Sequence, residues 1–152
     1  MKKEELNKKQ LQLVSPDQAE RLKWLGFHWD CDYSYDYTLG RSLTDKGFYS
    51  LNKKKHDNHY KEVPGVGMRY RNRCSASTVA LALKWFRDEK NLTGMIARNA
   101  TDWYFEICKA GCGTSVYFSP DSLRYEDGFE PYEAAESALL DELLTILEKD
   151  AL

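Results

Sequence analysis

The segment 53–73 has the composition of a loop that could bind anions. It holds seven lysines and arginines against two acidic residues, and tyrosines are interleaved with them. Basic side chains neutralise phosphates, and tyrosine rings can stack on nucleobases. The segment therefore suggests nucleic-acid binding, and the alternative is a hydrated loop that keeps the protein soluble. The candidate contacts are Lys53, Lys54, Lys55, Tyr60, Lys61, Arg69, Tyr70, Arg71 and Arg73.

The charge of the rest of the chain does not favour a nucleic-acid partner. The formal net charge is −2 at pH 7. Residues 121–150 alone hold ten acidic side chains and two basic ones. An acidic helix repels phosphates, so nucleic-acid binding through 53–73 is the less favoured hypothesis.

Two cysteines and two histidines could together hold a metal ion. Cys108 and Cys112 flank a turn that contains glycine, and His56 and His59 could supply two more ligands. Thiolates and imidazoles are the ligands of tetrahedral zinc sites. The cysteine spacing is looser than C-x-x-C, and the alternative is a pair of thiols beside a hairpin turn. We predict no cofactor and keep this zinc set as a minor hypothesis.

A cysteine nucleophile is a further possibility within the class of enzymes. Such a thiol needs a nearby base, and His28 lies three residues before Cys31. The two residues flank an expected junction between a helix and a strand, and no known nucleophile signature surrounds them. The sequence therefore leaves enzyme activity open and leans against it.

Capping signals and hydrophobic periodicity predict both helices and strands. Ser15, Pro16 and Gln18 favour a helix start, and Gly26 favours its end. Residues 31–39 alternate strictly, which predicts a strand with tyrosines on one face and polar residues on a wet face. The other expected elements are strands at 48–51, 92–98, 103–108 and 116–118, a helix from Ser75 or Ser77 to about Asn91, and a final amphipathic helix at 131–148.

The order of these elements is αββ-loop-αβββα, which indicates the α+β class. We expect a mainly antiparallel sheet in one layer, covered by three helices. Residues 1–13 are expected to be a flexible segment, and 14–150 a single domain with the basic loop at about 52–73 outside its core. No apolar run resembles an export signal or a membrane span, so we expect a cytoplasmic protein with reduced cysteines.

Two similarities bear on this order of elements, one to a known domain and one between two stretches of the chain. The αβββα stretch over 77–148 resembles the order of a double-stranded-RNA-binding domain, which implies phosphate contacts by lysines at the start of its last helix. This chain has carboxylates there, at Glu130 and Glu133, so RNA binding by that route is not expected. The stretches 19–24 and 80–85 are also alike, through either an αββ repeat or chance.

Three short pieces of the chain carry a resemblance to known sequences. They are Ser15-x-x-x-Ala-x-x-Leu-Lys-x-x-Gly-Phe27, Leu83-Lys-Trp-Phe-Arg-Asp88 and Asp127-Gly-Phe-Glu-x-Tyr-Glu-Ala-Ala135. Together they resemble a group of small uncharacterised proteins of bacterial and prophage genomes, which has no assigned activity. The resemblance implies a cytosolic protein linked to mobile elements that works by binding.

These observations favour a non-enzymatic interaction module that acts through a protein partner or through self-association. Exposed aromatic residues would form its adhesive surface, because large aromatic side chains dominate the energetics of protein interfaces. The candidate aromatic residues are Trp24, Trp29, Trp103, Tyr33, Tyr35 and Tyr37.

Overall fold

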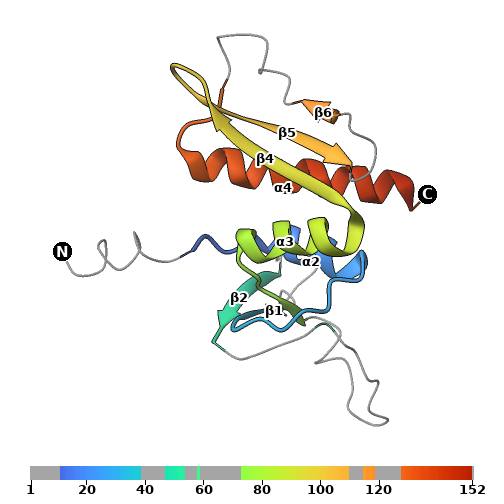
Figure 1. Ribbon diagram of the computed structural model, residues 1–152. Coiled ribbons are helices and arrows are strands. Elements are labelled where there is room, and N and C mark those ends of the chain that lie inside the picture. Colours follow the sequence, from blue (N-terminus) through green and yellow to red (C-terminus); the bar gives the residue numbers. More distant parts are fainter. Residues whose placement is uncertain are drawn as a thin grey trace, which may run out of the picture. The chain divides into compact units, whose positions relative to one another are not determined.

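The computed structural model describes residues 11–38, 47–53, 58, 73–109, 115–118 and 128–151. The chain divides into two compact units (Figure 1). We call Val14–Ser77 the first unit, and Thr78–Leu152 together with Met1–Leu13 the second unit. Each unit has its own sheet and its own buried residues, so each is described by itself.

The first unit begins with helix α2, Pro16–Trp24, whose ends are both capped as the sequence predicts. The Ser15 hydroxyl accepts a hydrogen bond from the Gln18 backbone N–H, and the Gln18 side chain accepts one from the Ser15 N–H. At the other end Gly26 has a φ of +93°, a conformation that glycine adopts without a Cβ penalty. The Phe27 N–H then bonds to the Leu22 carbonyl, which closes the helix in a Schellman motif.

The first unit also contains a small antiparallel sheet. Its strands are β1 (Ser34–Thr38), β2 (Phe48–Asn52) and β3 (Arg73–Ser75), in the order β2-β1-β3. β3 was not predicted, because Arg73 fell in the loop expected over 52–73 and Ser75 was a candidate start of the following helix. Helix α2 contacts β3. The buried side chains of this unit include Val14, Ala19, Leu22, Phe27, Cys31, Cys74 and Ala76.

The second unit has the order αβββα. Helix α3 (Val79–Lys90) is followed at once by β4 (Leu92–Arg98), then by β5 (Trp103–Lys109), β6 (Ser115–Phe118) and helix α4 (Tyr132–Asp150). The three strands form an antiparallel meander in the order β4-β5-β6. α3 is capped by Thr78, whose hydroxyl accepts from the Leu81 N–H, and not by Ser75 or Ser77 as expected.

Helix α4 covers one face of the second sheet, as Figure 1 shows. Of its predicted apolar stripe, Ala135, Leu139 and Leu143 are buried. Ile146 is half-buried and Tyr132, in the first turn, is exposed. Phe105 and Ile107 of β5 are buried as well. Gly94 of β4 lies so close to this helix that an added Cβ would come within 2.6 Å of the Leu139 methyl groups. The face of the sheet that carries Gly94, Phe105 and Ile107 is therefore the inner face.

The α+β class, the antiparallel pairing and the order of the predicted elements are confirmed. The expectation of a single β-layer was wrong, because the strands form two three-stranded sheets. Each unit starts with a helix and an antiparallel hairpin, but the third strand joins β1 in the first unit and β5 in the second. A single domain over 14–150 stays a prediction, and the proposed flexibility of 1–13 falls mainly on residues outside the described part.

No helix among the described residues is long and apolar enough to cross a membrane.

Candidate functional site

The basic segment that suggested nucleic-acid binding is described at only two of its nine candidate contacts. Lys53 follows β2 and is exposed, whereas Arg73 begins β3. The other seven lie outside the described residues, so nucleic-acid binding through this segment stays a prediction. They are Lys54, Lys55, Tyr60, Lys61, Arg69, Tyr70 and Arg71.

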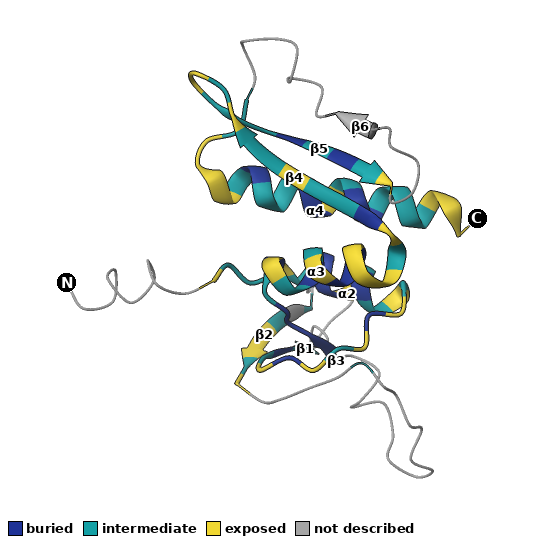
Figure 2. Ribbon diagram, viewed as in Figure 1, coloured by how far each residue is buried: buried dark blue, intermediate teal, exposed yellow. Residues whose placement is uncertain are grey.

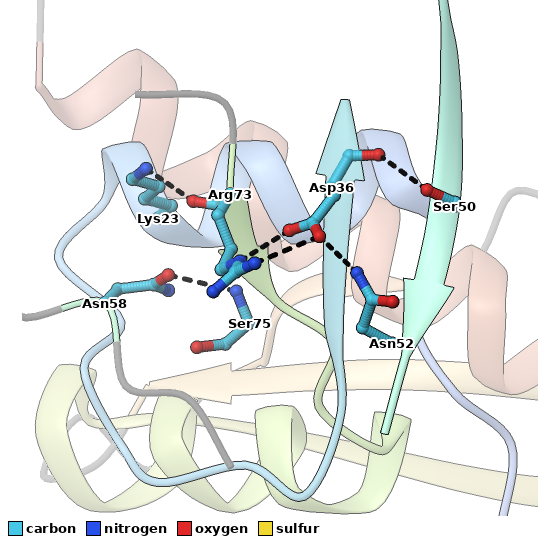
Figure 3. Close-up of polar contacts among 7 residues, drawn as sticks. All are labelled: Lys23, Asp36, Ser50, Asn52, Asn58, Arg73 and Ser75. Atoms are coloured by element: carbon cyan, nitrogen blue, oxygen red, sulfur yellow. Dashed lines mark hydrogen bonds and ion pairs between the residues drawn. The ribbon is translucent and has the colours of Figure 1, made fainter. Parts of the chain in front are cut away.

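Arg73 is part of a polar network that joins the three strands of the first unit (Figure 3). Its Nε lies 2.5 Å from Oδ1 of Asp36, and its second guanidinium nitrogen lies 3.1 Å from Oδ2. The Asn52 amide on β2 also donates to the same carboxylate. Both charged side chains are about one-third exposed or less, which strengthens the pair relative to one in bulk water. The Asp36 carboxylate therefore holds β3 to β1 through Arg73 and β2 to β1 through Asn52.

Two further side chains fix the backbone of β3. The Lys23 Nζ donates to the Arg73 carbonyl at 2.7 Å. Asn58 accepts from the Ser75 N–H at 3.0 Å through its Oδ1 (Figure 3). It also donates to the Phe27 carbonyl at 2.8 Å through its Nδ2. Buried backbone groups need such partners, and the network supplies them to a strand of only three residues. Its geometry is that of a structural clamp.

The thiols of the first unit are poor candidates for nucleophiles. Cys31 and Cys74 are both buried. Burial raises the pKa of Cys31 to about 11 and that of Cys74 to about 12. The reactive species is the thiolate, and at neutral pH these groups remain thiols. The pairing of His28 with Cys31 stays a prediction; the His28 Nδ1 lies 3.0 Å from the Gly26 carbonyl oxygen.

The zinc hypothesis is described at one of its four residues. Cys108 lies on β5, partly exposed, with its Sγ 3.5 Å from a Glu106 carboxylate oxygen. Cys112, His56 and His59 lie outside the described residues. Within the described ranges no three metal-ligating side chains gather. The zinc set stays a prediction.

The six aromatic residues singled out from the sequence differ widely in exposure. Trp24, at the end of α2, is 89% exposed. Trp29, Trp103 and the three tyrosines are partly covered. Tyr35 donates to the Val14 carbonyl at 2.7 Å, and the Tyr37 ring lies 4.9 Å from that of Tyr49. The tyrosine face of β1 therefore serves largely to pack the first unit, and among the residues of this unit that the structure describes, Trp24 is the most exposed large apolar side chain.

In the second unit, Trp103 is held in a cluster of aromatic and charged groups. The Tyr132 ring meets it edge to face with 4.9 Å between centroids. The Arg98 guanidinium lies 5.3 Å from the Trp103 ring centroid, and one of its nitrogens lies 3.7 Å from a Glu130 carboxylate oxygen. These contacts fix the end of β4 against the beginning of β5, next to the turn that connects the two strands.

The outer face of the second sheet is the face that α4 does not cover. Side chains alternate along a strand, so Thr93, Met95 and Ala97 of β4 point away from the inner face defined by Gly94. Met95 is 49% exposed, and its two neighbours on this face are partly exposed. Figure 2 shows that most of β4 is intermediate or exposed. This row of uncharged side chains lies along one margin of the sheet.

β4 is also an edge strand. It pairs with β5 on one side, and among the described residues no strand pairs with its other side. The ladder from Leu92–Lys109 to Arg98–Trp103 runs through seven consecutive pairs without a register shift. Its sequence, Leu-Thr-Gly-Met-Ile-Ala-Arg, has no proline or lysine and a charge only at its last residue. Proteins commonly protect open edges with such residues, with bulges or with short strands, and between Leu92 and Ala97 β4 has none of these devices.

No protein-family model, curated protein or solved structure matches this chain. The candidate site therefore rests on the geometry of the described residues alone. The sequence predicts the strand at 92–98, but nothing in it indicates that this strand lies at an edge. Edge position depends on the pairing of β5 with both β4 and β6, which is set by the fold of the whole unit.

Proposed function

We propose that this chain is a non-enzymatic interaction module that accepts an extended segment of a protein partner along the open edge of β4. The observation that carries this proposal is the continuous, unprotected edge strand Leu92–Arg98. On the resemblance noted above and on its expected reduced cysteines, we place this binding in the bacterial cytoplasm.

The main chain supplies most of the attraction in this mode of binding. Every second residue of an edge strand directs its N–H and C=O away from its own sheet, where an added strand can bond to them. Side chains then select the partner. On the outer face, Met95 would contact the residue opposite it, and thioether side chains adapt to varied apolar neighbours. We therefore expect a partner segment that alternates apolar residues and lacks proline.

The chemistry of the described residues supports binding over catalysis. The two buried thiols are held in the protonated form, and the Asp36–Arg73 pair is used to join strands. Open strand edges, by contrast, are templates for pairing with another chain. β4 is the longest of the described edge strands, which gives a partner the most main-chain polar groups to bond to.

A selection with displayed peptides tests this proposal. A phage library of random ten-residue peptides would be selected on the immobilised full chain, and enriched peptides titrated into the protein while amide NMR shifts are recorded. We expect the shifts to concentrate in 92–98 and binding to fall at least about tenfold in Met95→Lys, which puts a charge on the edge. The matched control is Leu51→Lys, at a 47% exposed position on β2. Peptides whose shifts avoid β4, or equal binding by both variants, would overturn the proposal.

Nucleic-acid binding by the first unit is the second candidate function, favoured by the exposure of Trp24. The helix that carries Trp24 also carries Lys23, whose Nζ bonds to the Arg73 carbonyl at the end of the basic segment. An exposed indole beside cations can stack on a base of a single strand. A gel shift with a single-stranded oligonucleotide at rising salt tests this.

The required result for this second candidate is binding that weakens steeply with salt, as expected where lysines neutralise phosphates. It must also be lost when Lys53, Lys54 and Lys55 are changed to Ala, and it must weaken in Trp24→Ala. Lys149→Ala, on the acidic helix α4, is the control and should bind as the wild type does. Absence of binding at low salt removes this candidate.

A further inference from the structure

We infer that the segment received by the β4 edge is β4 of a second copy of the same chain, so that two second units form one continuous antiparallel sheet. This inference rests on the proposed function, because both use the same edge. It goes further by naming the partner and the register. The sequence of β4 and the faces on which its side chains lie are the grounds for it.

One register uses the whole strand. With Met95 opposite Met95 of the second copy, all seven residues of β4 find a partner. Leu92 then lies opposite Arg98, Thr93 opposite Ala97, and Gly94 opposite Ile96. Because residues of like face are paired, the α4 helices of both copies lie on the same side of the joint sheet. A shift of one residue would pair inner with outer positions.

The chemistry of this register is self-complementary. Arg98 is the charged residue of β4, and it lies opposite the apolar Leu92, so like charges are not opposed. On the inner face the space over Gly94 is filled by Leu139 of the same copy, so Ile96 of the other copy would lie beside that leucine across the seam. On the outer face, Thr93, Met95 and Ala97 of the two copies form one uncharged row that covers the half-exposed Met95 thioether.

The interface made by a single strand pair is small. Stable complexes bury about 1,200–2,000 Å² in total, and smaller interfaces belong to weak or transient associations. We therefore expect a dimer whose fraction rises with protein concentration. The seven-residue ladder is longer than the usual strand of about five or six residues, which favours pairing there over a five-residue edge such as β2.

A charge swap at the two-fold centre tests the inference with the full chain. Met95→Lys and Met95→Glu each place like charges directly opposite in a homodimer, and each should raise the dimer dissociation constant at least about tenfold. An equimolar mixture should restore the dimer, because a lysine then faces a glutamate. Sedimentation velocity over a concentration series measures all three. Recovery on mixing also shows that both variants are folded.

Leu51→Lys on β2 is the control and should leave the dimer unchanged. A wild type that stays monomeric throughout the series overturns the inference, as does a dimer that persists in both Met95 variants or one that is lost in Leu51→Lys. These failures are separable from failure of the proposed function. A monomeric wild type that still binds selected peptides along 92–98 keeps the edge as a binding site and refutes only the second copy as its partner.

Discussion

The close contact between Gly94 and Leu139 allows a quantitative test of how α4 packs on the second sheet. A Cβ added at Gly94 would lie 2.6 Å from both Cδ atoms of Leu139, far inside van der Waals contact. Leu139 is fully buried, so it cannot swing into solvent. Insertion of a methyl group into a packed core costs about 1–3 kcal/mol. Replacement of a strand glycine by alanine recovers about 0.5–1 kcal/mol of backbone entropy.

We therefore expect Gly94→Ala to lower the free energy of unfolding by roughly 0.5–2 kcal/mol, the difference between those two effects. For a chain of this size that corresponds to a decrease in Tm of about 1–8 °C. Denaturant unfolding followed by circular dichroism measures the change. Leu139→Ala alone should cost about 2–5 kcal/mol because it leaves a cavity.

A double-mutant cycle separates steric crowding from other causes. In Leu139→Ala the added methyl group at position 94 has room, so the double variant should be more stable than the sum of the single effects predicts, by about 1 kcal/mol or more. Gly26→Ala is the matched control, because Gly26 has open space around its Cβ position and a φ of +93°. It should be destabilising through backbone strain alone and additive with Leu139→Ala. A neutral Gly94→Ala, or additivity with Leu139→Ala, refutes the reasoning.

Three further expectations concern titration and hydrogen bonding. Burial raises the pKa of Cys31 to about 11 and that of Cys74 to about 12. At pH 8 both should therefore be alkylated far more slowly than a free thiol in the native protein, and rapidly in denaturant. Peptide mapping by mass spectrometry measures the two rates. Burial, and then the charge of Glu133, raises the pKa of Glu136 in the folded protein. The contribution of Glu136 to stability is therefore present at low pH and is lost as the pH rises through its folded-state pKa. Glu136→Gln should raise Tm at pH 7 and leave it unchanged near pH 3. Asn58→Ala leaves the buried Ser75 N–H without its acceptor and should cost about 1–3 kcal/mol in denaturant unfolding, whereas a loss below 0.5 kcal/mol would contradict the clamp.

Helix boundaries were predictable because their determinants are local. The Ser15–Gln18 capping box and the glycine at 26 lie within one turn of the ends of α2, and each appears in the structure as a hydrogen-bond pattern. The apolar stripe of α4 needs only its own spacing to identify the buried face. The start of α3 was misplaced because three residues with hydroxyl groups, Ser75, Ser77 and Thr78, stand close together. Thr78 is the one whose hydroxyl accepts a hydrogen bond from a first-turn N–H of the helix, that of Leu81.

Features that depend on distant residues were not predictable. β3 has three residues, too few to show alternation, and it becomes a strand through pairing with β1. Asp36 was assigned to a wet face by the alternation of 31–39, yet Arg73, 37 positions later, covers its carboxylate. Ser34 was assigned to the same face and is fully buried. Alternation identifies the two faces of a strand, but it does not show that both faces are covered, as they are at these positions of β1.

The same distinction explains why the search for chemical motifs found only weak candidates. Motifs are recognised through side chains of particular types at particular spacings, as with the cysteine and histidine set. The binding capacity of an edge strand belongs instead to its main-chain N–H and C=O groups, which every residue except proline has. What makes β4 distinctive is its place in the order β4-β5-β6 and the lack of charge or bulge between Leu92 and Ala97. Met95 matters for binding only because β4 lies at the edge of its sheet. In that position, Met95 is the central residue of the one register that pairs β4 with a second β4 along its full length.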